Sequence, residues 1–316
     1  LERQPEDRPA FDITVPERGY AWWYVDALSE DGETGLTIIA LLGSVFSPYY
    51  AWSGWTRPLD HVALNVVLYN RKSSLWSMTE RGEGALARGR DELGFGRSRV
   101  CWAEDALQID VDEVTAPFPR RLQGVVRLRP AGTNPRRVAL DGVGEHAWWP
   151  IAPRARVEVE FAQPSIEWKV TGYLDSNWGN SPLEEPFRAW NWSRAPYRDG
   201  AAIFYDVQLR SGGALGVALG FDAENHAADI EAPPMVDLPV GSIWRVPRAT
   251  RADAGAEARV RRTLEDTPFY TRSVVDTRVH GTDVEGVHES LSLDRFKQSW
   301  VRTLLPFRMP RRGHRR

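Results

Sequence analysis

Short apolar or alternating segments recur along the chain, separated by residues that favour turns. In the first half these segments are residues 21–27, 36–46, 61–70 and 75–79. In the second half they are residues 156–161, 166–174, 201–209 and 214–221. Gln163-Pro164-Ser165 and Gly212-Gly213 mark turns between them. Runs of this length, rich in β-branched and aromatic residues, predict antiparallel β-strands in both halves.

A helical spacing is clear only near the C-terminus, where it predicts one short helix. Its apolar face consists of Phe296, Trp300, Val301, Leu304 and Leu305. Antiparallel strands without crossover helices hide their edges by closing into barrels or stacking as sandwiches. The 14 Trp and 11 Phe could wall a wide apolar barrel. The pattern therefore predicts an all-β (mainly β) protein of antiparallel β-barrel type.

The length of the chain predicts two domains. A single hydrophobic core usually stops growing at about 250–300 residues, and this chain has 316. The loop 179–186, GNSPLEEP, is rich in Gly, Pro and charge, which is typical of a boundary. We therefore expect an N-terminal domain over 1–181 and a C-terminal domain over 182–316.

Composition and charge exclude several classes of protein. The chain is 42% hydrophobic and 26% charged with a net charge of −3, which argues against a nucleic-acid partner. Cys101 is the single cysteine, so neither an internal disulfide nor a cysteine-based metal cage can form. No apolar run reaches 18 residues and the first residues are polar, which favours a cytoplasmic protein.

Known cofactor motifs are absent or incomplete. Gly94-Phe95-Gly96 is half of a dinucleotide fingerprint and lies in no βαβ pattern, and neither a phosphate-binding loop nor a GxSxG elbow occurs. His280 and His288 are eight residues apart, and no third ligand is evident. We therefore expect neither a metal nor a cofactor.

Two short segments combine aromatic and ionisable residues: EHAWWP at 145–150 and GYLDSNWGN at 172–180. Residues two apart on a strand point to the same face. His146 with Trp148, and Tyr173 with Asp175, could therefore address one cavity from neighbouring strands. The further wall of that cavity would consist of Trp178, Trp190, Trp192 and Trp23.

The spacing alone leaves a plainer interpretation open. The aromatic residues could be ordinary core, with Asp175 accepting turn hydrogen bonds and His146 a satisfied polar residue. There is also a weak internal echo, since Trp23-Tyr24-Val25-Asp26 and Gly172-Tyr173-Leu174-Asp175 each run from an aromatic strand into an expected acidic turn.

Several longer motifs resemble the carotenoid 1,2-hydratases, or hydroxyneurosporene synthases, of photosynthetic purple bacteria. They are AWWYVDALSEDG, LLGSVFSPYY, HAWWPIAPRARVEVEF, GYLDSNWGN and FRAWNW. The resemblance implies two lipocalin-like β-barrel domains and cofactor-free addition of water to the terminal C1=C2 bond of acyclic carotenoids such as lycopene and neurosporene. The essential His-x-Trp and Tyr-x-Asp pairs of that family match His146, Trp148, Tyr173 and Asp175.

The chemistry of alkene hydration suggests roles for these residues. Because an isolated alkene has no leaving group, hydration begins with proton delivery to C2 and leaves a tertiary cation at C1. Asp175 would be the acid, since burial among aromatic rings favours its protonated form. His146 would either hold that acid or position the attacking water. Trp148 and Tyr173 would face the cation, a contact worth about 0.5–2 kcal/mol.

A substrate stored in a membrane calls for a docking surface. The face formed by Phe296, Trp300, Leu304 and Leu305 precedes a basic tail of Arg308, Arg311, Arg312, Arg315 and Arg316. These residues could meet anionic lipid, which would place the protein in the cytoplasm, peripherally on the inner or photosynthetic membrane. A helix packed on a barrel with a solvated tail would explain the same residues.

Two other functions suit a barrel lined by aromatic residues. A non-catalytic carrier of carotenoid or lipid would need no ionisable pair, so the pairing of His146 with Asp175 argues against it. A carbohydrate-binding or glycoside-cleaving protein would suit the many Trp residues, but no matched second carboxylate is identifiable.

Overall fold

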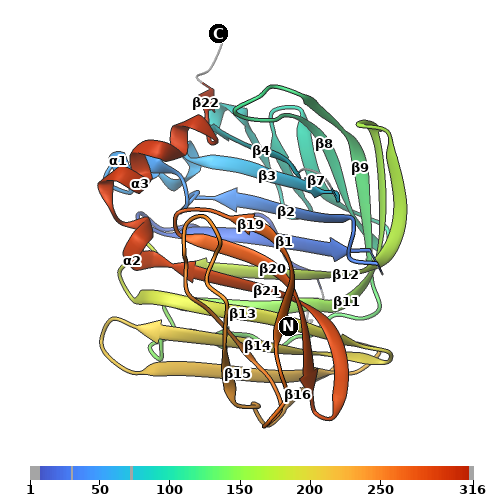
Figure 1. The fold of residues 1–316 in the computed structure, drawn as a ribbon. Helices are drawn as coiled ribbons and strands as arrows, with labels where there is room; N and C mark the ends of the chain where they lie inside the picture. The colour runs from blue at the N-terminus through green and yellow to red at the C-terminus, as the bar shows by residue number, and fades with distance from the viewer. Residues whose placement is uncertain (1–7, 30, 72–73, 313–316) are drawn as a thin grey trace, which may run out of the picture. The chain divides into compact units, whose positions relative to one another are not determined.

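The structure, a computed structural model, describes residues 8–29, 31–71 and 74–312 and is built mainly from β-strands (Figure 1). The chain divides into two compact units. Unit 1 comprises Leu1–Ala139, Glu145–Pro182 and Thr303–Arg316, and unit 2 comprises Leu140–Gly144 and Leu183–Arg302. Each is described by itself below.

Unit 1 is organised around one large sheet that curls, so that β7–β9 run at a steep angle to β1–β4 in Figure 1. Its pairing order in the described chain is β22-β4-β3-β2-β1-β12-β11-β9-β8-β7-β6-β5, with β10 paired to β11. All these pairings are antiparallel except β22 with β4. The elements are β1 (Tyr20–Leu28), β2 (Gly35–Leu42), α1 (Pro48–Trp52), η1 (Pro58–Asp60), β3 (Val62–Tyr69), β4 (Ser74–Arg81), η2 (Glu83–Ala85), β5 (Leu86–Arg88), β6 (Glu92–Phe95), β7 (Ser98–Ala103), β8 (Ala106–Val114), β9 (Arg121–Pro130), β10 (Val138–Ala139), β11 (His146–Gln163), β12 (Ile166–Gly179), η3 (Leu305–Phe307) and β22 (Arg311–Arg312).

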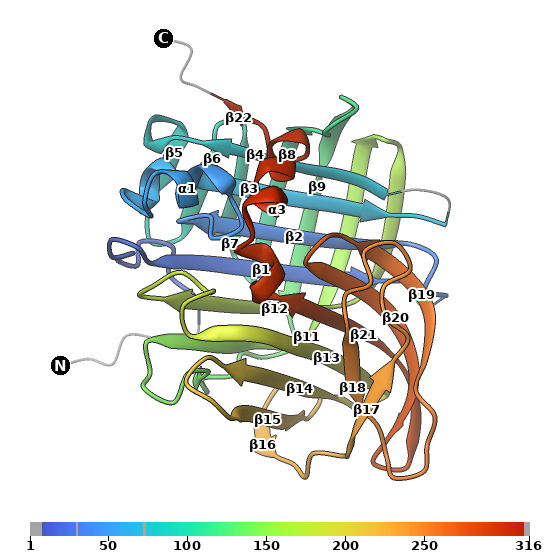
Figure 2. The ribbon, with the colours of Figure 1, turned by 60° about the vertical axis from the view of Figure 1, so that its left-hand side comes forward.

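Unit 2 contains a second antiparallel sheet, in the order β16-β15-β14-β13-β21-β20-β19, and a separate β17–β18 hairpin. Figure 2 shows β19–β21 curving away from β13–β16. The elements are β13 (Phe187–Tyr197), β14 (Gly200–Leu209), β15 (Ala214–Phe221), β16 (Ala227–Asp229), β17 (Met235–Leu238), β18 (Arg248–Arg251), β19 (Arg259–Asp266), β20 (Tyr270–Val279), β21 (Thr282–Ser292) and α2 (Leu293–Phe296), followed by α3 (Ser299–Leu304), which spans the boundary between the units.

The mainly antiparallel β architecture predicted from the sequence is confirmed, with small differences at strand ends. The strand expected over 36–46 ends at Leu42, because Gly43 turns the chain with a φ of +60°. A Cβ at Gly43 would lie 2.4 Å from the carbonyl oxygen of Gly19, so the turn requires glycine. The pattern missed β5–β9. Of these, β5 and β6 have only three and four residues, and β8 carries carboxylates at Asp110 and Asp112.

The C-terminal helix is interrupted, which divides the apolar face predicted for it. α2 and α3 have only four and six residues, so one helical spacing is not kept across 293–305. Phe296, Val301 and Leu305 are buried, whereas Trp300 and Leu304 are 47% and 41% exposed. The prediction that Phe296 and Leu305 form a docking face with Trp300 and Leu304 is therefore corrected.

Two arginines of the predicted basic tail are engaged within unit 1. The guanidinium of Arg308 lies 4.5 Å from the ring centre of Trp76. Arg311 pairs with the buried carboxylate of Glu80 and, at 3.2 Å, with Asp60, and it starts the short strand β22 on the edge of β4. Arg312 is exposed at the end of that strand. Arg315 and Arg316 lie outside the described residues.

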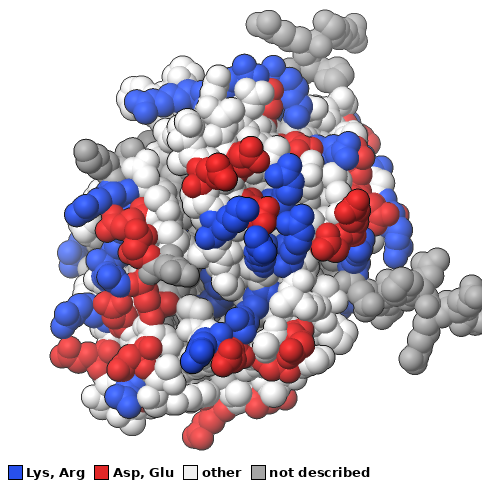
Figure 3. Space-filling view, turned by 90° about the vertical axis from the view of Figure 1, so that its right-hand side faces the viewer, with Lys and Arg blue, Asp and Glu red and all other residues white. Residues whose placement is uncertain are grey.

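Charged side chains of both signs lie next to one another on the side of the molecule shown in Figure 3. Within the described chain, no helix is both long enough and apolar enough to cross a membrane.

Candidate functional site

The β11–β12 hairpin of unit 1 changes character along its length. In its outer half, residues 155–163 and 166–171, positions alternate between one face packed on the core and one face open to solvent. In its inner half, residues 146–153 and 172–179, nearly all positions are buried on both faces. Both segments singled out from the sequence lie in or directly beside this inner half.

Alternation along the strands separates two sets of side chains in the inner half. Trp149 and Leu174 belong to the hydrophobic core of unit 1. The neighbouring residues Trp148, Tyr173 and Asp175 therefore point to the opposite face of the sheet. Trp148 and Tyr173 are fully buried, and Asp175 is 6% exposed. The site thus lies on the second face of the sheet and not in the core.

Two neutral donors hold one oxygen of the Asp175 carboxyl group. The indole Nε1–H of Trp148 donates to Oδ2 at 2.8 Å, and the phenol of Tyr173 donates to the same oxygen at 2.7 Å. Trp148 reaches Asp175 from the neighbouring strand, where its cross-strand partner is Asn177. The structure therefore brings three of the four predicted catalytic residues into one hydrogen-bonded group.

His146 is 1% exposed and has its own hydrogen-bond partners. Its Nδ1 lies 3.0 Å from the hydroxyl of Tyr20, and its Nε2 lies 3.1 Å from Oγ of Ser181. The strand partner of His146 is Gly179. Four residues of strand separate Gly179 from Asp175, a span of about 13 Å.

Strand β1 pairs with β12 and brings residues to the site other than Trp23, the one β1 residue expected there. Tyr24 is the partner of Asp175, and Asp26 is the partner of Tyr173. The two Tyr-x-Asp segments that echo each other in the sequence are therefore direct neighbours in the sheet. The rings of Tyr24 and Tyr173 meet edge to face at 6.0 Å. The signal was present in the alternation of Tyr20, Trp22, Tyr24 and Asp26.

The four tryptophans expected to wall the substrate cavity lie in different places. Trp23 belongs to the core of unit 1 and Trp178 packs against it, so both point away from the face that carries Asp175. Trp190 and Trp192 are buried on β13 of unit 2. Trp190 meets the ring of Tyr205 edge to face at 5.9 Å.

The histidines considered as metal ligands both bond to backbone carbonyls in unit 2. Nε2 of His280 lies 2.8 Å from the carbonyl oxygen of Glu231, and Nε2 of His288 lies 2.8 Å from that of Ala249. Burial lowers the pKa of His288 to about 4, which favours the neutral ring.

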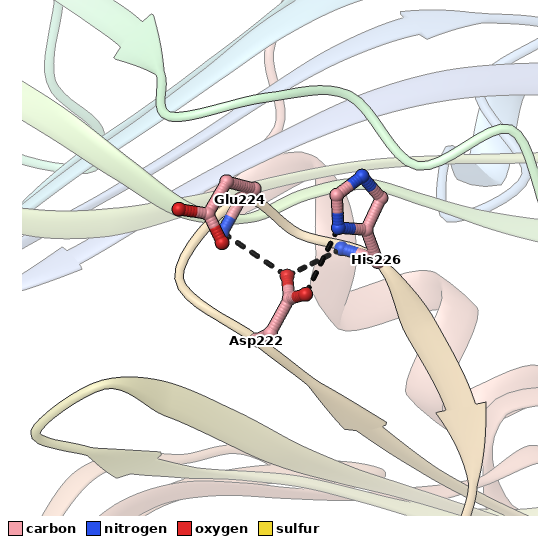
Figure 4. A group of neighbouring side chains, drawn as sticks. All are labelled: Asp222, Glu224 and His226. Atoms are coloured by element: carbon pink, nitrogen blue, oxygen red, sulfur yellow. Dashed lines mark hydrogen bonds and ion pairs between the residues drawn. The ribbon is translucent and has the colours of Figure 1, made fainter.

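One group of three possible metal ligands occurs among the described residues, at the exposed turn between β15 and β16 (Figure 4). It consists of Asp222, Glu224 and His226. Asp222 accepts hydrogen bonds from the backbone N–H groups of Glu224 at 3.0 Å and His226 at 2.8 Å. These bonds close the turn, and turn closure accounts for the grouping.

Comparison with known proteins gives a consistent result. The family model described as carotenoid hydratase CrtC matches residues 38–316. The acyclic carotenoid 1,2-hydratase of Thiocapsa roseopersicina is 51% identical over 98% of this chain and 77% of its own length. The protein of the same name from Rubrivivax gelatinosus is 46% identical over 96% of this chain and 76% of its own length.

Solved structures with a similar fold are distant in sequence. A protein of Nitrosomonas europaea assigned as AttH has a TM-score of 0.60 at 14% identity and covers 92% of this chain and 96% of its own. CghA in complex with Sch210972 has a TM-score of 0.60 at 11% identity, with the same coverage. These likenesses concern the fold alone, and they agree with the mainly β architecture predicted from the sequence and with the lipocalin-like fold that the resemblance implies.

Proposed function

Because the chain belongs to the carotenoid hydratase family CrtC, we propose that it is a carotenoid 1,2-hydratase that adds water to the terminal C1=C2 bond of acyclic carotenoids such as lycopene and neurosporene. The observation that carries the proposal is the buried Asp175 carboxyl group with Trp148 and Tyr173 donating to one of its oxygens. A protein that only carries an apolar ligand, without reacting with it, has no need of a buried carboxyl group.

The reaction begins with the proton of Asp175. That proton forms the new bond to C2 with the π electrons of the alkene, and a tertiary cation is left at C1. This step requires Asp175 to carry a proton before the reaction, and burial acts in that direction because it penalises the charged carboxylate. Hydrogen bonds to the charged form are stronger than those to the neutral form. The donors Trp148 and Tyr173 therefore stabilise the carboxylate as it appears in the transition state.

This arrangement gives Trp148 and Tyr173 a role beyond facing a cation. An aromatic face needs no particular substituent to attract a positive charge. The indole N–H and the phenol O–H, by contrast, are the atoms that contact Asp175. We propose that donation to Asp175 is their principal contribution to the rate.

Water completes the addition by forming the C1–O bond and releasing a proton. The sequence left two roles open for His146, and we propose the second of them, the handling of water through the hydroxyl groups bonded to its ring. Both of its ring nitrogens have hydroxyl partners, and its strand partner is four residues from Asp175. The proton released by water returns to the Asp175 carboxylate, so the addition is redox-neutral and regenerates the acid.

Mass analysis of the product tests the proposal. Purified protein is incubated with lycopene in liposomes without added cofactor, and the extracted carotenoid is examined for a gain of one water. We expect hydrated product with this protein and unchanged lycopene without it. Bound lycopene of unchanged mass would contradict the proposal and favour a carrier.

We also propose that the enzyme contacts a membrane through exposed apolar side chains near its C-terminus. Leu304 and Phe307, both in unit 1, are 41% and 70% exposed. The double variant Leu304→Ser with Phe307→Ser should bind anionic phospholipid vesicles at least about fivefold more weakly in co-sedimentation. Phe118→Ser is the matched control, since Phe118 is 80% exposed on another loop of unit 1. Equal binding by all three proteins would exclude this surface.

A further inference from the structure

Gly179 makes room for two side chains that meet above the middle strand of three. It is the cross-strand partner of Tyr20 on β1 and of His146 on β11. The two outer strands of such a triplet are about 10 Å apart, so their side chains meet only if the middle position is empty. A Cβ at Gly179 would lie 2.3 Å from Nδ1 of His146 and 2.7 Å from Cε1 of Tyr20.

The hydroxyls of Tyr20 and Ser181 occupy the two ring nitrogens of His146. A neutral imidazole has one N–H donor and one acceptor nitrogen. A hydroxyl can donate or accept, so both hydroxyls are compatible with either tautomer. If the hydroxyl of Tyr20 donates to Nδ1, the proton of the neutral ring is on Nε2, which then donates to Ser181. The phenol of Tyr20 prefers to donate because it is the more acidic hydroxyl, which favours the tautomer with the proton on Nε2.

These three groups run from the interior toward solvent. Tyr20 and His146 are 2% and 1% exposed, while Ser181 is half-buried on the loop after β12. Tyr20 is also held by stacking on Trp22, at a ring separation of 4.9 Å and an interplanar angle of 17°. A rigid hydroxyl–imidazole–hydroxyl line of this kind can orient a water molecule or pass on a proton, as general acid–base groups do.

We propose that Tyr20, Gly179 and Ser181 are positioning residues that hold His146 in one ring orientation and one tautomer, so that it handles the water of the hydration reaction. The proposal rests on the proposed function, because it assigns partners to a residue of that site. The contacts themselves do not depend on which substrate is bound.

The state of the His146 ring can be measured without substrate. The ring-nitrogen NMR shifts of ¹⁵N-histidine-labelled protein report the tautomer, and the chain has only six histidines, so His146→Ala assigns the signal. We expect one dominant tautomer in the wild-type protein and a shifted or averaged signal in Tyr20→Phe and Ser181→Ala. Ser181→Thr should restore the wild-type signal. An unchanged His146 signal in Tyr20→Phe and Ser181→Ala would overturn the proposal, whether or not the protein hydrates carotenoids.

Kinetics then test whether Tyr20 acts through His146. Tyr20→Phe should lower kcat by about tenfold with less than about a threefold change in KM. In a His146→Ala background the same substitution should have little further effect, because the interaction is already lost. A full tenfold loss in both backgrounds would show that Tyr20 acts elsewhere. Altered NMR signals in a protein that never hydrates lycopene would reject the proposed function and leave the positioning intact.

Gly179→Ala tests the packing argument, with Gly89→Ala as the matched control. A Cβ at Gly89 would meet nothing within 4 Å, so that variant should keep both the wild-type His146 signal and kcat. Gly179→Ala must displace the His146 ring, and we expect a kcat similar to that of His146→Ala. A His146 signal and a kcat like those of the wild type in Gly179→Ala would contradict the proposal.

Discussion

The two halves of the β11–β12 hairpin differ in the surroundings of their carboxyl groups. In the outer half, Glu158 is surrounded by Arg129, Arg156 and Lys169 at 3.1–3.7 Å, on the face open to solvent. In the inner half, Asp175 is 6% exposed and receives hydrogen bonds from neutral donors. Water screens the first group, whereas burial leaves the second to be stabilised by its immediate neighbours. One pair of strands therefore carries both a solvated surface and a candidate acid.

Replacing the candidate acid should have the largest effect. Asp175→Asn keeps the shape and burial of the side chain but removes the proton that hydration needs. We expect turnover to fall by about 10³-fold or more, with lycopene binding and the circular dichroism spectrum largely retained. Substantial hydration by this variant would remove Asp175 as the proton donor.

Removing one donor to Asp175 should have a smaller effect. Trp148→Phe and Tyr173→Phe each delete one hydrogen bond to Oδ2 and keep an aromatic ring. We expect each to lower kcat by about tenfold to a hundredfold. Trp168→Phe on the outer half of the same hairpin is the control, because Trp168 packs against the core of unit 1.

Trp148→Phe also separates donation from stabilisation of the cation by the ring face. If Trp148→Phe retains full activity while Trp148→Ala loses it, the face of the aromatic ring supports the reaction and the hydrogen bond to Asp175 does not.

His288, a buried histidine of unit 2, allows the effect of burial on an ionisable side chain to be measured through the pH dependence of stability. Burial lowers the pKa of His288 from 6.5 to about 4. The unfolded chain therefore binds a proton that the folded chain does not in the window between these values. Stability should fall as the pH falls through this window, with about 2 kcal/mol lost between about pH 7 and pH 5.

Urea unfolding of the wild-type protein and of His288→Asn measures this contribution. The variant should lose about 2 kcal/mol less than the wild type over the same pH range, whatever its absolute stability. Equal pH dependence in the two proteins would show that His288 does not carry it.

Charge removal in the outer half should have the smallest effect. Glu158→Gln deletes an acceptor shared by exposed cations, and such pairs contribute about 0–1 kcal/mol. We expect unfolding free energy and kcat to stay close to those of the wild type. A loss of activity comparable to that of Asp175→Asn would remove the distinction between the two halves.

The sequence by itself determined the β architecture and the residues of the candidate site. The period of two in segments such as RVEVEF gave the strands and the face each side chain takes, because side chains alternate along any strand. Together with the family resemblance, the motifs HAWWP and GYLDSNWGN indicated His146, Trp148, Tyr173 and Asp175. The C-terminal helix was also found, although not its interruption.

Only the tertiary structure decided which of these residues contact one another. Strand register brings Trp148 to Asp175 and pairs the two Tyr-x-Asp segments, and it seats His146 beside Tyr20 over Gly179. Register also places Trp23 and Trp178 on the opposite face from Asp175. These contacts join residues as far apart as Tyr20 and Gly179, which are 159 positions apart in the chain. Local sequence fixes the face of a side chain within its strand, but the neighbour across the strand depends on how the whole sheet pairs.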